Sequence, residues 1–74
     1  MTVKEGKIYL NNLIDKGYSE EPVFILRGRD TLSSDVVLLW ARSAEISNVN
    51  EEKVCSAIKI SHEMAQWANK RLPD

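Results

Sequence analysis

The chain contains a single cysteine, Cys55, in 74 residues, and this limits how so short a domain can be stabilised. A domain of this size hides only about 60% of the surface that its unfolded chain exposes, so small domains usually rely on disulfides, a metal or a partner subunit. One cysteine cannot form an internal disulfide, and no Cys/His cluster has the spacing of metal ligands. We therefore expect a single domain over residues 1–74, without metal or cofactor, that assembles as a homo-oligomer.

The charge balance and the apolar runs narrow the possible partners and the location. Ten basic and eleven acidic side chains give a formal net charge of -1. This argues against binding of duplex DNA, whose affinity depends on neutralising many phosphates, but it permits a small anionic ligand held by two or three arginines. The longest apolar run, Val36–Ala41, is far shorter than the roughly 20 residues that cross a bilayer. With a lone cysteine and no signal peptide, we expect a cytoplasmic protein without a membrane partner.

The N-terminal residues predict a helix. Thr2 and Glu5 have the spacing of a capping box, and Gly17 suits the left-handed residue that follows a helix, so we expect a helix over residues 2–16. A glycine inside this stretch disfavours the helix, and a short strand over residues 7–10 is the alternative.

Residues 21–30, with the sequence EPVFILRGRD, predict a buried strand or an extended segment. Pro22 excludes a helix interior, and the Val-Phe-Ile-Leu run that follows favours β structure. A lone buried strand would leave backbone groups unpaired. It therefore needs a partner, either the N-terminal segment or a second chain.

The remainder of the chain predicts two helices. One runs from about residue 34 to 46 after Ser33 as its N-cap, with a wide apolar arc that places Trp40 in the core. The other runs from about residue 51 to 72, with Asn50 as its N-cap. The middle of the apolar stripe of this last helix consists of small side chains. Another backbone can therefore approach closely at Ala57, Ser61, Ala65 and Ala68. The predicted fold class is therefore mainly α: about three helices with one short extended or β segment.

No residue pattern indicates catalysis. Nucleophilic chemistry needs a nucleophile next to a base that a third group orients. The only histidine, His62, lies two helical turns from Cys55 on the polar face of the last helix, which is too far for a thiolate–imidazole pair. Phosphate-binding loops, metalloprotease motifs and paired carboxylates are also missing from the sequence. We expect a protein that is not an enzyme.

The segment Arg27-Gly28-Arg29-Asp30 is the best candidate for a ligand site. Alternate residues of an extended segment point the same way, so the two guanidinium groups should converge, and guanidinium groups match phosphate oxygens in pairs. Glycine lets a ligand approach the backbone, and the N–H groups of the next helix favour an anion. Asp30 could orient a ribose or a base. The alternative is that Asp30 pairs with an arginine and caps the turn, with Gly28 serving the turn geometry.

Further residues are expected to contact the ligand or a second subunit. Ser33 and Ser34 would offer donors at the helix start, and Arg42 would assist from the same helix. A tryptophan could also stack on a nucleobase, which is worth about 1–3 kcal/mol. We expect the contacts between subunits at Leu38, Ile60, Met64 and Trp67.

Residues 22–41, with the sequence PVFILRGRDTLSSDVVLLWA, resemble a pattern in small proteins encoded by tailed phages and prophages. That pattern has Pro-Val/Ile-Phe, an apolar pair, Arg, a small residue, any residue and Asp, followed by a helix that ends in Trp-Ala. The resemblance covers about a quarter of the chain and carries over no binding or catalytic residue. It implies an accessory protein that acts in the host cytoplasm.

Two functional hypotheses follow. In the first, the chain sequesters a phosphate-bearing small molecule, such as a signalling nucleotide, as a measure against host defence. This association with phage accessory proteins is an analogy at the level of the class. In the second, the chain is a protein–protein interaction module that inhibits or adapts a host protein through an exposed apolar helix face. The identity of the ligand, the number of subunits and the host target are not encoded in any motif.

Overall fold

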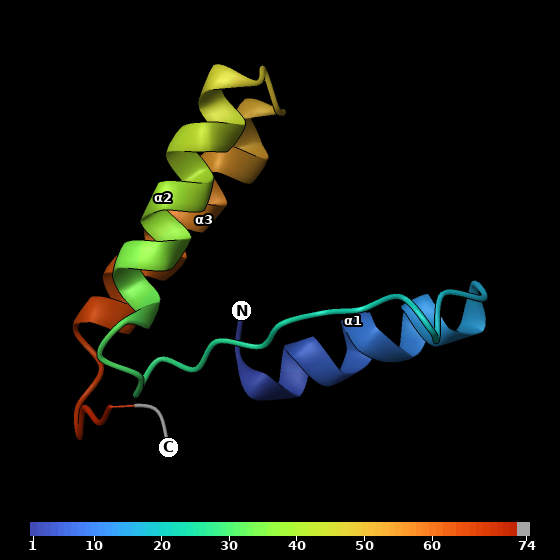
Figure 1. Ribbon diagram of the computed structural model, residues 1–74, viewed down its shortest axis with the longest axis horizontal. Helices are drawn as coiled ribbons and strands as arrows, with labels where there is room; N and C mark the ends of the chain where they lie inside the picture. Colours follow the sequence, from blue (N-terminus) through green and yellow to red (C-terminus); the bar gives the residue numbers. More distant parts are fainter. Residues whose placement is uncertain (73–74) are drawn as a thin grey trace.

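The computed structural model describes residues 1–72, and over that range it contains three α-helices and no sheet (Figure 1). The helices are α1 (Val3–Asp15), α2 (Ser33–Ile46) and α3 (Glu51–Ala65). The mainly α prediction with three helices is confirmed. Within the described range, none of these helices has both the length and the apolar character needed to cross a bilayer.

Helix α1 begins and ends through local chemistry. The hydroxyl of Thr2 accepts a hydrogen bond from the backbone N–H of Glu5 at 3.2 Å, and the backbone N–H of Thr2 donates to the Glu5 carboxylate at 3.1 Å. The helix ends at Asp15, and Gly17, two residues later, has a φ of +91°, the left-handed conformation that favours glycine. Both predicted signals are confirmed, and the alternative strand over residues 7–10 is wrong.

Helices α2 and α3 form an antiparallel hairpin that packs on small side chains (Figure 1). The side chains buried between them are Ser33, Ala41, Ala44, Val54, Ala57 and Ser61. The close approach predicted at Ala57 and Ser61 is confirmed. The core position predicted for Trp40 is wrong, because Trp40 is 51% exposed. Its neighbour Ala41 faces α3, and successive helical residues point about 100° apart.

Helix α3 begins as predicted but ends earlier. The side chain of Asn50 accepts a hydrogen bond from the backbone N–H of Glu52 at 2.8 Å, which confirms the N-cap. The helix stops at Ala65 instead of Leu72, so Ala65 and Ala68 are exposed. The reason is a tertiary contact: residues beyond the helix turn back toward the segment before α2.

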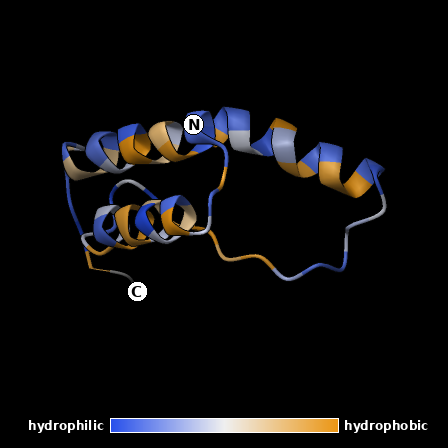
Figure 2. Ribbon diagram, turned by 90° about the horizontal axis from the view of Figure 1, so that it is seen from above, coloured by the Kyte–Doolittle hydropathy of each residue, from blue (hydrophilic) through white to orange (hydrophobic). Residues whose placement is uncertain are grey.

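Residues 22–27 are extended but form no strand, and they are not buried. Phe24 is 86% exposed, and its neighbours Val23 and Ile25 are also exposed. The buried-strand prediction is wrong, and the extended alternative holds. Figures 1 and 2 show α1 and this segment projecting away from the hairpin. Among the three helices only α2 and α3 are in contact, and α1 buries no residue.

Candidate functional site

The Arg27–Asp30 segment forms a tight turn immediately before α2, so the extended geometry from which we expect the two guanidinium groups to converge is wrong for these residues. The backbone N–H of Asp30 donates to the carbonyl of Arg27 at 3.0 Å. The Asp30 carboxylate accepts a hydrogen bond from the backbone N–H of Leu32 at 2.8 Å, and the backbone carbonyl of Asp30 accepts one from the backbone N–H of Ser33. Asp30 therefore caps this turn, as one of the two alternatives expected. Ser33 is not the N-cap: α2 begins with Leu32 in that position, and Leu32 makes no side-chain cap.

The predicted donors at the start of α2 do not all reach the surface. Ser33 is completely buried, and its hydroxyl donates to the carbonyl of Asp30 at 2.9 Å. That hydroxyl therefore serves the turn, and we remove Ser33 from the candidate site. Ser34 is half-buried at the helix start. Arg42 is exposed but lies roughly 13 Å further along α2, at about 1.5 Å of rise per residue, so the structure does not bring it to the turn.

The C-terminal segment folds against this turn, which sequence patterns did not indicate. The backbone N–H of Arg71 donates to the carbonyl of Arg29 at 2.7 Å, and the carbonyl of Arg71 accepts from Thr31 at 2.9 Å. These bonds form an isolated parallel β-bridge between Asp30 and Arg71. In Figure 1 the red end of the chain lies beside the green segment that precedes α2.

Gly28 lies directly against the end of α3. A Cβ placed on Gly28 would lie 3.6 Å from Cγ of Trp67 and 3.9 Å from Cα of Met64, which is ordinary contact. The ammonium of Lys70 donates to the Gly28 carbonyl at 2.6 Å and also to the carbonyl of Met64. One cation therefore links the turn to the C-terminal end of α3, where cations are favoured by the helix dipole.

Basic side chains gather around the turn. We call Arg27, Arg29, Lys70 and Arg71 the basic cluster. Asp30 is the only acidic residue in the two segments 27–31 and 66–72, and it is engaged in the turn. Arg27 is exposed and Arg29 half-buried, and neither guanidinium forms an ion pair or hydrogen bond with residues 1–72. The alternative in which Asp30 pairs with an arginine is therefore not seen.

Trp67 adds an aromatic surface to the basic cluster. Its side chain contacts the Gly28 position and is still 62% exposed. Trp67 was expected on α3 as a contact between subunits, but it follows the helix and lies at the turn. No local sequence pattern places Trp67 at the turn, because the contact joins positions about forty residues apart.

The other expected subunit contacts do not form one exposed patch. Leu38, Ile60 and Met64 are half-buried in the single chain. A more exposed apolar surface lies on the side of α2 that faces away from α3. We call this surface the outer face of α2; it consists of Leu32, Val36, Leu39, Trp40 and Ile46.

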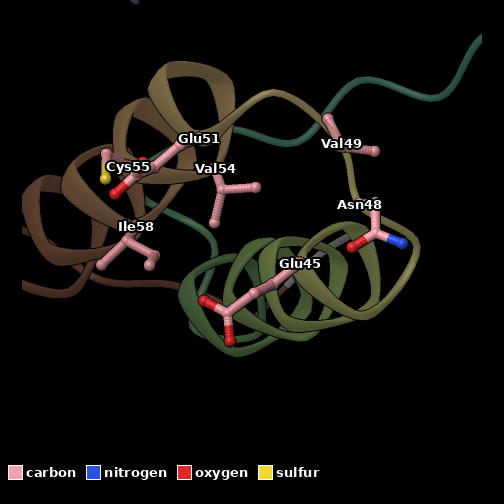
Figure 3. Close-up of a pocket in the computed structure, with 7 residues that line it drawn as sticks. All are labelled: Glu45, Asn48, Val49, Glu51, Val54, Cys55 and Ile58. Atoms are coloured by element: carbon pink, nitrogen blue, oxygen red, sulfur yellow. The ribbon is translucent and has the colours of Figure 1, made fainter.

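A cavity lies at the other end of the hairpin, beside the loop between α2 and α3 (Figure 3). Its volume is about 360 Å³, and it is lined by Glu45, Asn48, Val49, Glu51, Val54, Cys55 and Ile58. Two carboxylates and no basic side chain line this cavity, so its electrostatics disfavour an anion. It contains none of the expected site residues.

Comparisons with known proteins give no relative for this chain. No protein-family model, no curated protein and no solved structure matches it. Within residues 1–72, no group of three or more His, Cys, Asp or Glu side chains is placed to hold a metal ion.

Proposed function

We propose that the protein is a non-enzymatic binding protein that holds a phosphate-bearing small molecule of the nucleotide type at the turn before α2. The observation that carries the proposal is an exposed indole, Trp67, beside Gly28 in the middle of the basic cluster. Guanidinium groups bind phosphate oxygens in pairs, and stacking on an aromatic face contributes about 1–3 kcal/mol per base.

Each residue has a distinct part in the proposed site. Arg27 and Arg29 grip phosphate, because neither guanidinium is engaged by residues 1–72. Trp67 packs beside Gly28, the residue between the two arginines. The positive end of the α2 dipole adds to the attraction for an anion, with Ser34 at the helix start. The second carboxylate oxygen of Asp30 orients a ribose hydroxyl or a base amine.

The proposed role is to sequester the ligand without transforming it. Segments 27–31 and 66–72 contain no histidine or cysteine, and the one carboxylate there already accepts a backbone hydrogen bond. No pair of a nucleophile and an oriented base is present in them. Together with the phage-like pattern of residues 22–41, this favours the capture of a host signalling nucleotide in the cytoplasm as a counter-defence function.

A thermal-shift screen against cyclic dinucleotides, cyclic trinucleotides and ADP-ribose tests the proposal. A ligand at one hundred times its Kd stabilises the folded state by about 2.7 kcal/mol and raises the Tm. Arg27→Ala should abolish the shift, and Trp67→Ala should weaken it. Lys53→Ala is the matched control, because it removes an exposed positive charge at the far end of α3. The proposal fails if no compound shifts the Tm, or if Arg27→Ala binds as the parent does.

A second candidate function rests on the outer face of α2. Its large apolar side chains are exposed, with Leu39 at 66%, and such patches mark protein-binding surfaces. In that case the protein is an interaction module that inhibits or adapts a host protein. Nucleotides would then never shift the Tm, and Leu39→Lys would abolish binding to the host protein while Arg27→Ala would not.

A further inference from the structure

The single chain exposes more surface than a folded protein of its mass. A folded monomer of 8.4 kDa exposes roughly 4,600 Å² by the usual scaling. This chain exposes 6454 Å². Its radius of gyration is 13.4 Å, whereas roughly 11.3 Å is typical of a compact domain of this length. The excess area is therefore on the order of 1,800 Å² per chain.

Most of the large exposed apolar side chains lie in two separate places. One is the outer face of α2, whose residues fall within about 120° of the helix circumference at 100° per residue. The other is the N-terminal arm, which we define as residues 1–26. In the arm, α1 buries no residue, and Val3, Ile14 and Phe24 are exposed. Figure 2 shows the arm standing apart from the hairpin, with apolar colour along the extended segment.

From these two surfaces we infer that the arm of one chain packs on the outer face of α2 of a second copy. The two surfaces are of the same apolar kind, and within the arm α1 is connected to the turn before α2 by residues 22–27, which have no regular structure. Such a connection allows an arm to pass to a neighbouring chain at little cost. A reciprocal exchange covers roughly 3,600 Å² in total, which falls within the range of obligate homodimers.

A second copy of the chain fits the two surfaces because the area to be covered matches that of a homodimer interface. A small peptide or a loop of the same chain would leave most of the excess exposed. This interface does not include Arg27, Arg29 or Trp67, so it is independent of the proposed nucleotide site and each can fail without the other.

Light scattering coupled to size exclusion tests the exchange on the full chain. The wild-type protein should elute with the mass of at least two chains. Leu39→Lys on α2 and Ile14→Lys on α1 should each reduce the mass to that of one chain, 8.4 kDa. A lysine in the last turn of α1 is compatible with the helix dipole, so the arm stays helical. Ser56→Lys, at an exposed position of α3, adds the same charge and should not change the mass.

Two results of the mass measurements would overturn the inferred exchange. A wild-type protein with the mass of one chain overturns the inference. Dissociation by Leu39→Lys but not by Ile14→Lys also overturns it, because the α2 faces would then pair without the arm. Circular dichroism shows whether each variant keeps its helices.

A second measurement avoids charged variants. In Trp67→Phe the only tryptophan left is Trp40, which belongs to the outer face of α2. Its fluorescence should shift to shorter wavelength as the protein concentration rises, because the arm of the second copy covers the indole. An emission maximum that stays constant over the concentration range in which the mass changes would overturn the inference.

Discussion

The two glycines at turns differ in what a side chain would cost. Gly17 has a φ of +91°, a conformation that costs a residue with a Cβ about 1–2 kcal/mol. Gly28 lies outside that region, and a Cβ there would reach only ordinary contact with Trp67. We predict that Gly17→Ala lowers the free energy of unfolding by about 1 kcal/mol, and that Gly28→Ala changes it by less than about 0.5 kcal/mol. Urea unfolding measures both, and equal losses would contradict this contrast.

Lys70 is the residue that holds the C-terminal segment against the turn. Its ammonium donates to the carbonyls of Gly28 and Met64, and it is half-buried. A hydrogen bond that involves a charged group contributes about 1.5–3 kcal/mol to stability. We predict that Lys70→Met lowers the free energy of unfolding by about 1–2 kcal/mol. Urea unfolding tests this, with Lys53→Met at an exposed position as the control. If both variants lose the same free energy of unfolding, Lys70 does not hold the C-terminal segment against the turn.

Helix α1 carries a pH dependence through its capping box. The hydrogen bonds from Thr2 to the Glu5 carboxylate hold the pKa of Glu5 below its ordinary value of 4.5. Because this pKa is lowered in the folded state, the cap contributes its full stability to α1 at pH values above the ordinary pKa. That stability is lost as the pH falls through the folded-state pKa. We predict that the helical signal decreases on acidification more in the wild type than in Glu5→Gln. Circular dichroism from neutral to acidic pH measures this; parallel curves would exclude the effect.

Sequence patterns predicted the elements whose signals are local. The caps of α1 at Thr2 and of α3 at Asn50 involve residues two or three positions apart, so their geometry follows from the sequence alone. The end of α3 did not follow, because it depends on Lys70 and Arg71 reaching a turn about forty positions earlier in the chain. Periodicity continues through residues 66–72, but the chain leaves the helix after Ala65 and Asn69 adopts a left-handed φ of 58°.

Hydrophobic periodicity also does not show which side of α2 packs on α3. Its apolar arc is wide enough for two faces, and hydrophobicity alone placed Trp40 in the core. The side of α2 that packs on α3 instead carries Ala41 and Ala44, because small side chains let the two backbones approach. For the candidate site, the sequence identified Arg27 to Asp30 but not the contribution of Trp67. An aromatic residue that follows a helix has no periodic signal.

At the scale of the whole molecule, the fully buried side chains of residues 1–72 are few and small. The largest side chain in the buried core of residues 1–72 is valine, at Val54, and full burial of such a side chain contributes only about 1.5–3 kcal/mol. Ordering each residue costs about 1–2 kcal/mol of backbone entropy, and half-buried side chains such as Leu38, Ile60 and Met64 add to what this small core contributes. Under the inferred exchange, burial of the arm and of the outer face of α2 adds further stability.

Stability should therefore depend on the concentration of the chain. When folding is coupled to association, mass action raises the Tm as the concentration rises, whereas the Tm of a monomer is constant. We predict a rising Tm for the wild type and for Arg27→Ala, and a constant, lower Tm for Leu39→Lys. Differential scanning calorimetry at several concentrations measures this. A constant wild-type Tm would mean that the thin hairpin core suffices on its own, and the arm would then have to be explained without a second copy.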